Sequence, residues 1–544
     1  MQLAGNVYQA VDCENKVGVG VTLTEQYAAS LRRYQLPEFD SSWGAVNRGL
    51  EKESLRVTTD GYIAVSDHPV ILGSALTNPY ITTDFSEALL EFITPAYQDI
   101  DKTLSVLENI HSFTVMNLES DELLWTSSMP CPMGSNEDIR LAEYGKSNIG
   151  KLKTLYRSGL SHRYGSLMQV IAGLHYNFSM PECFWTAYQQ IKGNTDPLQE
   201  FITDQYLHLI RNFHRYSWLL LYLFGASPAA CKCFVEGREH NLQQMETGSL
   251  FLPDATCLRM GNLGYKSEAQ KSLFVCYNEL DAYVDCLQQA MNTVYAEYEE
   301  IGQMKNGEYL QMNTNLLQLE NEFYSTIRPK RVARAGQRPL ESLTKDGIEY
   351  VEVRALDLNP FLPLGIDAEQ IHFLDTFLLH CLLSESHECN EQEFFENSKN
   401  LAAVVEHGRD ENLTLTVDGT PIRLKQWANE LLSDLEYSAV LFDESHDGEN
   451  YLSSLQTQRA KVDNPDLTPS GQMLREMKES QLSFFDFAMN QSRIHKEYFL
   501  TAKLERSTID HMMETSKTSL ISQKEIEATD SLGFEEFLQQ WNQV

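Results

Sequence analysis

The sequence has no apolar stretch long enough to cross a membrane. Its most apolar run, Trp218–Phe224, is far shorter than the roughly 20 residues that a spanning helix needs. Near the start of the chain, Asp12 and Glu14 stand where a signal peptide would have basic residues followed by an apolar run. We therefore expect no membrane association and a cytoplasmic protein.

Cysteine is scarce for the length of the chain. Ten cysteines in 544 residues do not make the dense disulfide framework of small secreted domains. Cys231 and Cys233 form a close pair, but the single residue between them is too short a spacing for a usual zinc site. We expect Cys131, Cys231 and Cys233 to be reduced and to have no catalytic role.

Positively charged residues are scarce as well. The chain has 43 Lys and Arg against 77 Asp and Glu, which gives a net charge of −34. A protein that binds nucleic acid needs a basic face to meet phosphate, so this class is disfavoured, as are anionic membrane surfaces. Most of the acids are expected on a solvated surface, within which a few could still be ligands.

Three glycine-containing motifs are also missing. The sequence has no phosphate-binding G-x-x-x-x-G-K-[ST] loop and no dinucleotide-binding G-x-G-x-x-G fingerprint. Use of ATP through either motif is therefore disfavoured. The G-x-S-x-G turn of many serine hydrolases is absent too.

The sequence does contain a large α+β pattern. At 544 residues and 42% hydrophobic residues, the chain is longer than a usual domain and can bury a sizeable core. No linker rich in Pro, Gly or Ser divides it, so we expect an N-terminal extension over 1–40 and a single catalytic unit over 41–544. The unit is expected to have its core at about 43–385 and a mainly helical remainder at about 386–544. Periodicity predicts helices over 24–34, 99–118, 151–164, 197–224, 268–300 and 470–506, and strands over 88–93, 166–179 and 349–357.

Acidic residues inside apolar segments are the most informative feature. In the segment 84–95, Asp84, Glu87 and Glu91 stand among core-forming leucines and a phenylalanine. A buried carboxylate must be paired, protonated or bound to a metal, because burying it alone costs many kcal/mol. A strand over 48–57 would add Glu51 and Glu53 on one face, since side chains alternate along a strand.

These acids predict a metal site if their strands converge. Hard cations such as Mg²⁺ prefer oxygen ligands, and the candidate ligands are Glu51, Glu53, Asp84, Glu91 and Glu352, with His175 beside them. The spacing leaves an alternative open, in which the acids form ordinary ion pairs with Arg48, Lys52, Arg56 and Arg354. Paired carboxylates also serve glycosidases, but the interleaved Arg and Lys suit anionic substrates better.

Six segments follow one another in an order that points to a known family. They are 47–56 (NRGLEKESLR), 81–95 (ITTDFSEALLEFITP), 154–160 (TLYRSGL), 173–179 (GLHYNFS), 327–331 (IRPKR) and 349–357 (EYVEVRALD). Together they closely resemble glutamate–cysteine ligase (γ-glutamylcysteine synthetase) of the proteobacterial type. The resemblance runs from about Trp43 to Leu383 and is patchy after about residue 390.

This resemblance implies a reaction and a fold. The reaction is the ATP-dependent ligation of L-cysteine to the γ-carboxylate of L-glutamate through a γ-glutamyl phosphate, the first step of glutathione biosynthesis. The fold is similar to that of glutamine synthetase, in which a curved, largely antiparallel sheet forms a cup supported by helices. ATP is the implied co-substrate and Mg²⁺, or Mn²⁺ in its place, the implied metal. Feedback inhibition by glutathione is a further implication, and we expect a monomer that binds no nucleic acid.

The matching positions also carry the family's functional residues. They imply metal ligands at Glu51, Glu53, Asp84, Glu91, His175 and Glu352, the same six that the acid pattern offers. Glu87 matches no ligand position and is expected to be a structural or surface acid. Arg354 is implied at the transferred phosphoryl group, and Lys330 and Arg331 are candidates for contacts with the ATP phosphates. Substrate-binding roles are implied for Arg259, at a substrate carboxylate, and for Tyr156, Arg157, Leu160, Ile171, Tyr265 and Tyr324, around the incoming amino acid. A strand over 166–179 would put Gln169 and Asn177 on the same face as His175. Both are candidates for hydrogen bonds with the substrate glutamate.

Two alternatives stay open. A related carboxylate–amine ligase with another amine acceptor would share the metal ligands and differ around the incoming amino acid. A catalytically inactive relative would have lost one or more of the metal carboxylates, and none is missing.

Overall fold

The centre of the molecule is a seven-stranded antiparallel sheet. The computed structural model describes residues 45–131, 138–264, 268–271, 273–332, 337–446 and 448–542; the helix expected over 24–34 and Tyr265 lie outside them. The strands of the sheet are β1 (Asn47–Thr58), β2 (Ile81–Thr83), β3 (Leu89–Ile93), β4 (Glu122–Leu124), β5 (Leu174–Ser179), β11 (Ile327–Lys330) and β12 (Tyr350–Leu356). They lie in the order β11-β12-β5-β1-β3-β2, and β4 pairs with the end of β1.

The two faces of the sheet differ because side chains alternate along each strand. On one face, Arg48 forms a fully buried ion pair of 2.6 Å with Asp375 of helix α11 (Ala368–Leu383). The hydroxyl of Tyr176 donates to the other oxygen of Asp375 at 2.5 Å. This buried network fixes the face that packs on helices, so Glu51 and Glu53 point to the opposite face.

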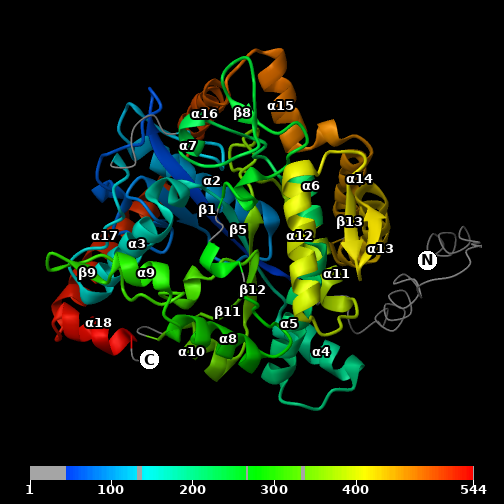
Figure 1. Cartoon of the computed structure of the whole chain (residues 1–544), viewed down its shortest axis with the longest axis horizontal. Coiled ribbons are helices and arrows are strands. Elements are labelled where there is room, and N and C mark those ends of the chain that lie inside the picture. The colour runs from blue at the N-terminus through cyan, green and yellow to red at the C-terminus, as the bar shows by residue number, and fades with distance from the viewer. Residues whose placement is uncertain are drawn as a thin grey trace, which may run out of the picture.

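Helices surround the sheet on both sides. In Figure 1, α11, α12, α13 and α14 lie to the right of the central strands, and α3, α9, α17 and α18 lie to the left. The helices are α2 (Ile100–Asn117), α3 (Asn148–Tyr164), α4 (Glu182–Lys192), α5 (Leu198–Tyr216), α6 (Trp218–Phe224), α7 (Lys232–Val235), α8 (Leu280–Asn292), α9 (Ala296–Ile301), α10 (Pro339–Asp346), α11, α12 (Glu391–His407), α13 (Leu424–His446), α14 (Asn450–Asp463), α15 (Pro469–Glu479), α16 (Phe484–Thr501), α17 (Arg506–Thr529) and α18 (Phe534–Asn542). No helix within the described residues is both long and apolar enough to span a membrane.

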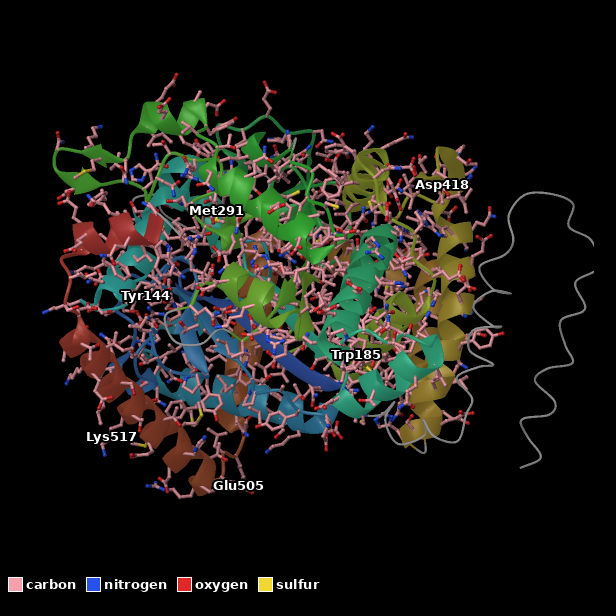
Figure 2. The ribbon with its side chains drawn as sticks, turned by 90° about the horizontal axis from the view of Figure 1, so that it is seen from below. Tyr144, Trp185, Met291, Asp418, Glu505 and Lys517 are labelled. Atoms are coloured by element: carbon pink, nitrogen blue, oxygen red, sulfur yellow. A yellow bond between two sulfur atoms is a disulfide. The ribbon has the colours of Figure 1, made fainter. Side chains whose placement is uncertain are left out.

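Three small sheets lie outside the central one. They are β6-β8-β7 (Ala229–Ala230, Leu250–Phe251 and Gln243–Gln244), β9-β10 (Met304–Lys305 and Glu308–Tyr309) and β13-β14 (Thr414–Val417 and Thr420–Arg423). Figure 2 labels Asp418 at the turn of the last hairpin and shows α17, marked by Glu505 and Lys517, along another edge of the molecule.

One continuous hydrophobic core joins the sheet to its helices. It extends in sequence from Val46 to Met512. A second, smaller cluster lies at the C-terminal end, where Leu538 of α18 packs with Leu152 and Leu155 of α3 and with Met312. The C-terminal helix α18 therefore packs against α3.

Several predicted elements are confirmed. The helices predicted over 99–118 and 151–164 are α2 and α3, and the strands predicted over 88–93 and 349–357 are β3 and β12. The part of the chain after about residue 368 is mainly helical, as expected, apart from the hairpin β13-β14.

The strand predicted over 166–179 is wrong in its first half. Residues Ser166–Val170 form a 3-10 helix, and β5 begins at Leu174, which pairs with Lys52 of β1. Between them, the main-chain N–H of Ala172 donates to the carbonyl of Ser128, outside the sheet. The apolar alternation of this segment therefore reflects burial in the core and not pairing with a neighbouring strand.

Three predicted long helices are each divided. The segment 197–224 breaks at Ser217 into α5 and α6. The helix predicted over 268–300 is wrong in its first third, because Glu268–Gln270 is a short 3-10 helix and α8 begins only at Leu280. The rest breaks at 293–295, where Leu316 donates to the carbonyl of Thr293 and Tyr295 donates to that of Thr314, as in a strand pair. The segment 470–506 breaks near Gln481, whose positive φ of 51° ends the helical path.

One prediction about cysteine is also wrong. Cys131 and Cys231 form a disulfide, with their Cα atoms 5.5 Å apart, whereas the sequence predicts reduced thiols. Cys233 lies beside this disulfide. The two bonded residues are 100 positions apart in the chain, so their spacing gave no indication of the pairing.

Candidate active site

A cavity of about 690 Å³ opens on the polar face of the sheet. Its size is typical of sites for small molecules, which measure roughly 300–1,000 Å³. The walls are formed by β1, β3, β5, β11 and β12 on one side and by α3 on the other. Most of the predicted site residues line it: Glu51, Glu53, Asp84, Glu91, Tyr156, Arg157, Leu160, Gln169, His175, Arg259, Tyr324, Lys330, Glu352 and Arg354.

Strand register brings the predicted metal ligands together. Glu51 on β1 is opposite His175 on β5, and Glu53 on β1 is opposite Glu91 on β3. The ring nitrogen Nδ1 of His175 lies 3.3 Å from Oε2 of Glu51 and 3.7 Å from Oε1 of Glu352, and its Nε2 lies 3.7 Å from Oε1 of Glu53. His175 is therefore at the centre of the acidic cluster.

The cluster contains two sets of three potential ligands that share His175. One set is Glu51, His175 and Glu352, and the other is Glu53, Glu91 and His175; within each set the ligand atoms lie within 4.8 Å of one another. Asp84, in the turn between β2 and β3, lines the same cavity. Two metal positions side by side are consistent with this arrangement.

Two acids of the cluster, Glu53 and Glu91, are destabilised as carboxylates by burial and by their acidic neighbours. Burial and the neighbouring Asp84 raise the pKa of Glu53 to about 8. Burial, together with Glu51, Asp84 and Glu53, raises the pKa of Glu91 well above its usual range. Carboxylates that repel each other in this way fit a divalent cation, which would relieve the repulsion.

Glu352 has a different environment. Burial alone would raise its pKa, but Lys330 and Arg354 hold that pKa well below the usual range. Its Oε1 lies 3.3 Å from Nη1 of Arg354. Its Oε2 is buried and accepts no hydrogen bond from the described residues, although Nζ of Lys330 is 3.4 Å away. An ionised carboxylate whose buried oxygen accepts no hydrogen bond from the described residues is well suited to a cation, so the donor set as a whole fits Mg²⁺ or Mn²⁺.

The alternative of ordinary ion pairs is wrong for three of the four proposed cations. Arg48 pairs with Asp375, and Arg56 pairs with Glu122 at 3.2 Å. Lys52 points to the helical face, where its Nζ lies 2.8 Å from Nε2 of His111. Only Arg354 of these four lies among the acids.

Glu87 is a structural acid, as expected. Its Oε1 accepts a hydrogen bond from the main-chain N–H of His68 at 2.9 Å, and its Oε2 accepts one from that of Glu143 at 3.0 Å. Both oxygens are thus used in holding two loops together.

Arg259 reaches the cavity from outside the sheet. Its Nε donates to Asp357 at 2.7 Å, and its Nη2 donates to the carbonyl of Leu356 at 2.8 Å. Its Nη1 lies close to Gly173, where a Cβ atom would be only 2.9 Å away. A side chain at 173 would press on this guanidinium, and the described residues supply no hydrogen-bond acceptor for Nη1.

Four predicted site residues are placed differently from the rest. Ile171 is fully buried and does not line the cavity. Asn177 does not line it either, but its Nδ2 donates to Oε1 of Glu51 at 2.8 Å and so orients a ligand. Arg331 turns away and contacts Gln199 and the carbonyl of Gly347, both at 3.3 Å. Tyr265, the fourth, lies outside the described residues.

Several residues that line the cavity were not predicted, among them Arg328, Lys153 and Trp541. Arg328 is opposite Glu352 in the register of β11 and β12, and its position two residues before Lys330 was a signal for the same strand face. Lys153 lies one helical turn before Arg157 on α3, and burial lowers its pKa to about 8. Trp541, on the C-terminal helix, had no signal in the sequence.

Comparison with known proteins identifies the family. The family model described as glutamate-cysteine ligase matches residues 32–404. The glutamate–cysteine ligase of Alcanivorax borkumensis is 48% identical over 498 residues, which cover 91% of this chain and 95% of that protein. The one from Azotobacter vinelandii is 49% identical over 493 residues, which cover 90% and 93%. The crystal structure of glutamate–cysteine ligase from Francisella tularensis in complex with AMP superposes with a TM-score of 0.87 at 36% identity, covering 92% of this chain and 98% of that one. The chain belongs to the glutamate–cysteine ligase family.

Proposed function

We propose that this protein is a glutamate–cysteine ligase that uses ATP and a divalent cation. It joins L-cysteine to the γ-carboxylate of L-glutamate through a γ-glutamyl phosphate, in the first step of glutathione biosynthesis. The observation that supports this best is the convergence of five carboxylates and His175 in one cavity of a chain from this family.

The acids of the polar face would hold the metal. Glu51 and Glu352 with His175 form one set of ligands, and Glu53 and Glu91 with the same histidine form the other. When bound there, Mg²⁺ neutralises the charge of the phosphates and of the acceptor carboxylate. The curved sheet then acts as the wall of a cup around the reacting groups.

Arg354 would stabilise the transferred phosphoryl group. Glu352 and His175 hold its Nη1, at 3.3 and 3.4 Å. Its Nε is buried and has no partner within the described part of the chain. A guanidinium held in this way presents a planar, two-pronged donor to phosphoryl oxygens at little reorganisation cost. Lys330 adds a second cation on the same face, and Arg328 a third.

The amino acids would occupy the part of the cavity near Arg259. Nη1 of this arginine, which has no acceptor among the described residues, suits a substrate carboxylate. Tyr156, Leu160 and Tyr324 are available around the incoming cysteine. A free carboxylate is a poor acyl donor, so its phosphorylation is what makes attack by the neutral cysteine amine feasible.

One assay tests the proposal. ADP release is measured with glutamate, ATP and Mg²⁺, with cysteine present, replaced by 2-aminobutyrate or omitted. We expect turnover that requires glutamate and increases with cysteine. Turnover independent of glutamate would refute the proposal, and turnover with another amine but not with cysteine would favour the related carboxylate–amine ligase. The single catalytic unit, the monomeric state, the cytoplasmic location and feedback by glutathione stay predictions.

A further inference from the structure

The C-terminal helix α18 forms part of the cavity wall. Its buried Leu538 packs against Leu152 of α3 and Met312, and Nδ2 of Asn542 donates to the carbonyl of Met312 at 3.1 Å. These contacts dock the end of the helix over the cavity, where Trp541 is one of the lining residues. The family model ends at residue 404, so this helix lies outside the matched region.

Trp541 has an unused hydrogen-bond donor. Its indole Nε1 is buried, and the described residues supply no acceptor for it. A buried N–H without a partner costs roughly 1–3 kcal/mol, so such a group in a binding cavity points to a ligand that accepts from it. The guanidinium of Arg338 lies over the indole ring, 5.6 Å from its centre.

Helix α3 shows which end of the cavity Trp541 occupies. Ile149 and Leu152, near the start of α3, belong to the cluster that packs with Trp541. Tyr164, at the other end of α3, is followed directly by the 3-10 helix that carries Gln169. Fifteen residues of helix separate Ile149 from Tyr164, which is about 22 Å at 1.5 Å per residue.

The two ends therefore suit different substrates. Gln169 and Arg259 lie at the end proposed for the amino acids, because Arg259 approaches Gly173 just after the 3-10 helix. At the other end, Trp541 meets Arg338, which follows Lys330 along the chain. The acidic cluster on the sheet lies along the same cavity, so a nucleotide with its phosphates at the metal would extend toward Trp541.

We propose that Trp541 binds the base of the nucleotide. The indole meets the edge of the purine, and its Nε1 donates to a ring nitrogen of the base. The neighbouring lining residues Ile149, Leu152 and Leu319 are apolar. Apolar walls beside the indole N–H suit a flat, uncharged heterocycle better than the charged groups of an amino acid. This inference rests on the proposed function in taking ATP as the nucleotide.

Binding measurements without amino acids test the inference. The dissociation constants of Mg-ATP, AMP and Mg-tripolyphosphate are measured by titration calorimetry for the wild type, Trp541→Phe and Trp541→Ala. We expect Trp541→Phe, which keeps an aromatic wall and removes the donor, to weaken ATP and AMP binding about tenfold, the value of one hydrogen bond. Trp541→Ala should weaken both further, and tripolyphosphate, which has no base, should bind all three proteins equally. The exposed neighbour is the control, and Gln540→Ala should bind ATP as the wild type does.

Steady-state kinetics give a second readout. The KM for ATP should rise about tenfold in Trp541→Phe, and the KM values for glutamate and cysteine should stay within twofold. An increase in the KM for cysteine or glutamate instead of ATP would overturn the inference, as would an equal loss of tripolyphosphate affinity. If the wild type binds ATP but releases no ADP with glutamate, the proposed function fails, and the calorimetry still decides the role of Trp541.

Discussion

Replacing Glu91 by Gln should stabilise the metal-free protein and remove its stabilisation by Mg²⁺. The side chain lies beside a like charge, because its ligand atom is within 4.8 Å of that of Glu53. Burial and the nearby acids Glu51, Asp84 and Glu53 raise its pKa well above the usual range. This carboxylate therefore destabilises the folded wild type unless a cation is bound.

The size of the effect follows from the geometry. If Glu53 and Glu91 were both ionised, two unit charges at 4.8 Å, the upper limit of their separation, would repel by about 3–4 kcal/mol at an effective dielectric constant of 20. Because Glu91 lines an open cavity and is partly solvated, we expect the substitution to recover about 2 kcal/mol. A folded chain of this length has an unfolding entropy near 1 kcal/mol/K, so the melting temperature in EDTA should rise by about 2 °C.

Mg²⁺ should reduce the difference in melting temperature between the two proteins, because it stabilises the wild type more than Glu91→Gln. A cation at a hundred times its dissociation constant stabilises the folded state by about 2.7 kcal/mol, which is roughly 2–3 °C here. Melting curves are recorded by scanning fluorimetry in EDTA and across a Mg²⁺ series. The wild type should shift upward with Mg²⁺, and Glu91→Gln should start higher and shift little.

A matched control lies four residues away. Glu87→Gln also removes a buried acid from this segment, but both oxygens of Glu87 accept main-chain hydrogen bonds. It should lower the melting temperature in EDTA and in Mg²⁺ alike, by the equivalent of roughly 1–3 kcal/mol, and keep the full Mg²⁺ shift. A Glu91→Gln protein that melts below the wild type in EDTA, or that keeps the full Mg²⁺ shift, would refute the reasoning.

Four further outcomes are expected. In EDTA, the stability of the wild type should fall as pH rises from 4.5 to about 8. The pKa of Glu53 is raised to about 8, so in that window the folded state binds more protons than the unfolded state. Mg²⁺ should flatten this pH profile, and an unchanged slope would count against a metal at these acids. Arg354→Ala should lower kcat by at least about a hundredfold, and a near-normal kcat would remove this residue from the mechanism. Asp357→Asn leaves Arg259 buried without its ion-pair partner, so the free energy of unfolding measured in urea should fall by about 3–5 kcal/mol. The KM for an amino acid substrate should rise as well. Wild-type values of both quantities would contradict the role of Asp357 in positioning Arg259. Cys131→Ser removes a cross-link that closes a loop of about 100 residues, worth typically 2–4 kcal/mol, so it should melt lower than the wild type without reductant and equally with dithiothreitol.

The sequence predicted local structure better than long-range pairing. Glu51 and Glu53 share a face because alternation along one strand requires it. Their meeting with His175 depends on the register of β1 against β5, between residues 124 positions apart, and no local pattern encodes that register. The resemblance to a known family supplied this information, and the structure places those ligands in one cavity.

The errors also have physical causes. The segment 166–179 alternates in hydrophobicity because it is buried on several sides, and a 3-10 helix can satisfy that pattern as well as a strand can. Trp541 was not predicted because the last helix of a chain can dock in many places. Its contacts with Leu152 and Met312 are apolar and depend on shape, which the sequence does not specify.

The segment Glu51-Lys52-Glu53 shows why its charge pattern wrongly allowed ion pairs between the lysine and its two neighbouring glutamates. In the sequence, a lysine between two glutamates is compatible with ion pairs that neutralise them. In the sheet, Lys52 points to the opposite face, where burial lowers its pKa to about 7 and its Nζ lies 2.8 Å from His111. The sheet thus separates the lysine from the acids that flank it. The charge of Glu51 and Glu53 must therefore be met from the cavity side, where Arg354 and Lys330 lie and where a divalent cation would bind. Alternation along one strand is therefore what leaves these acids able to bind a metal.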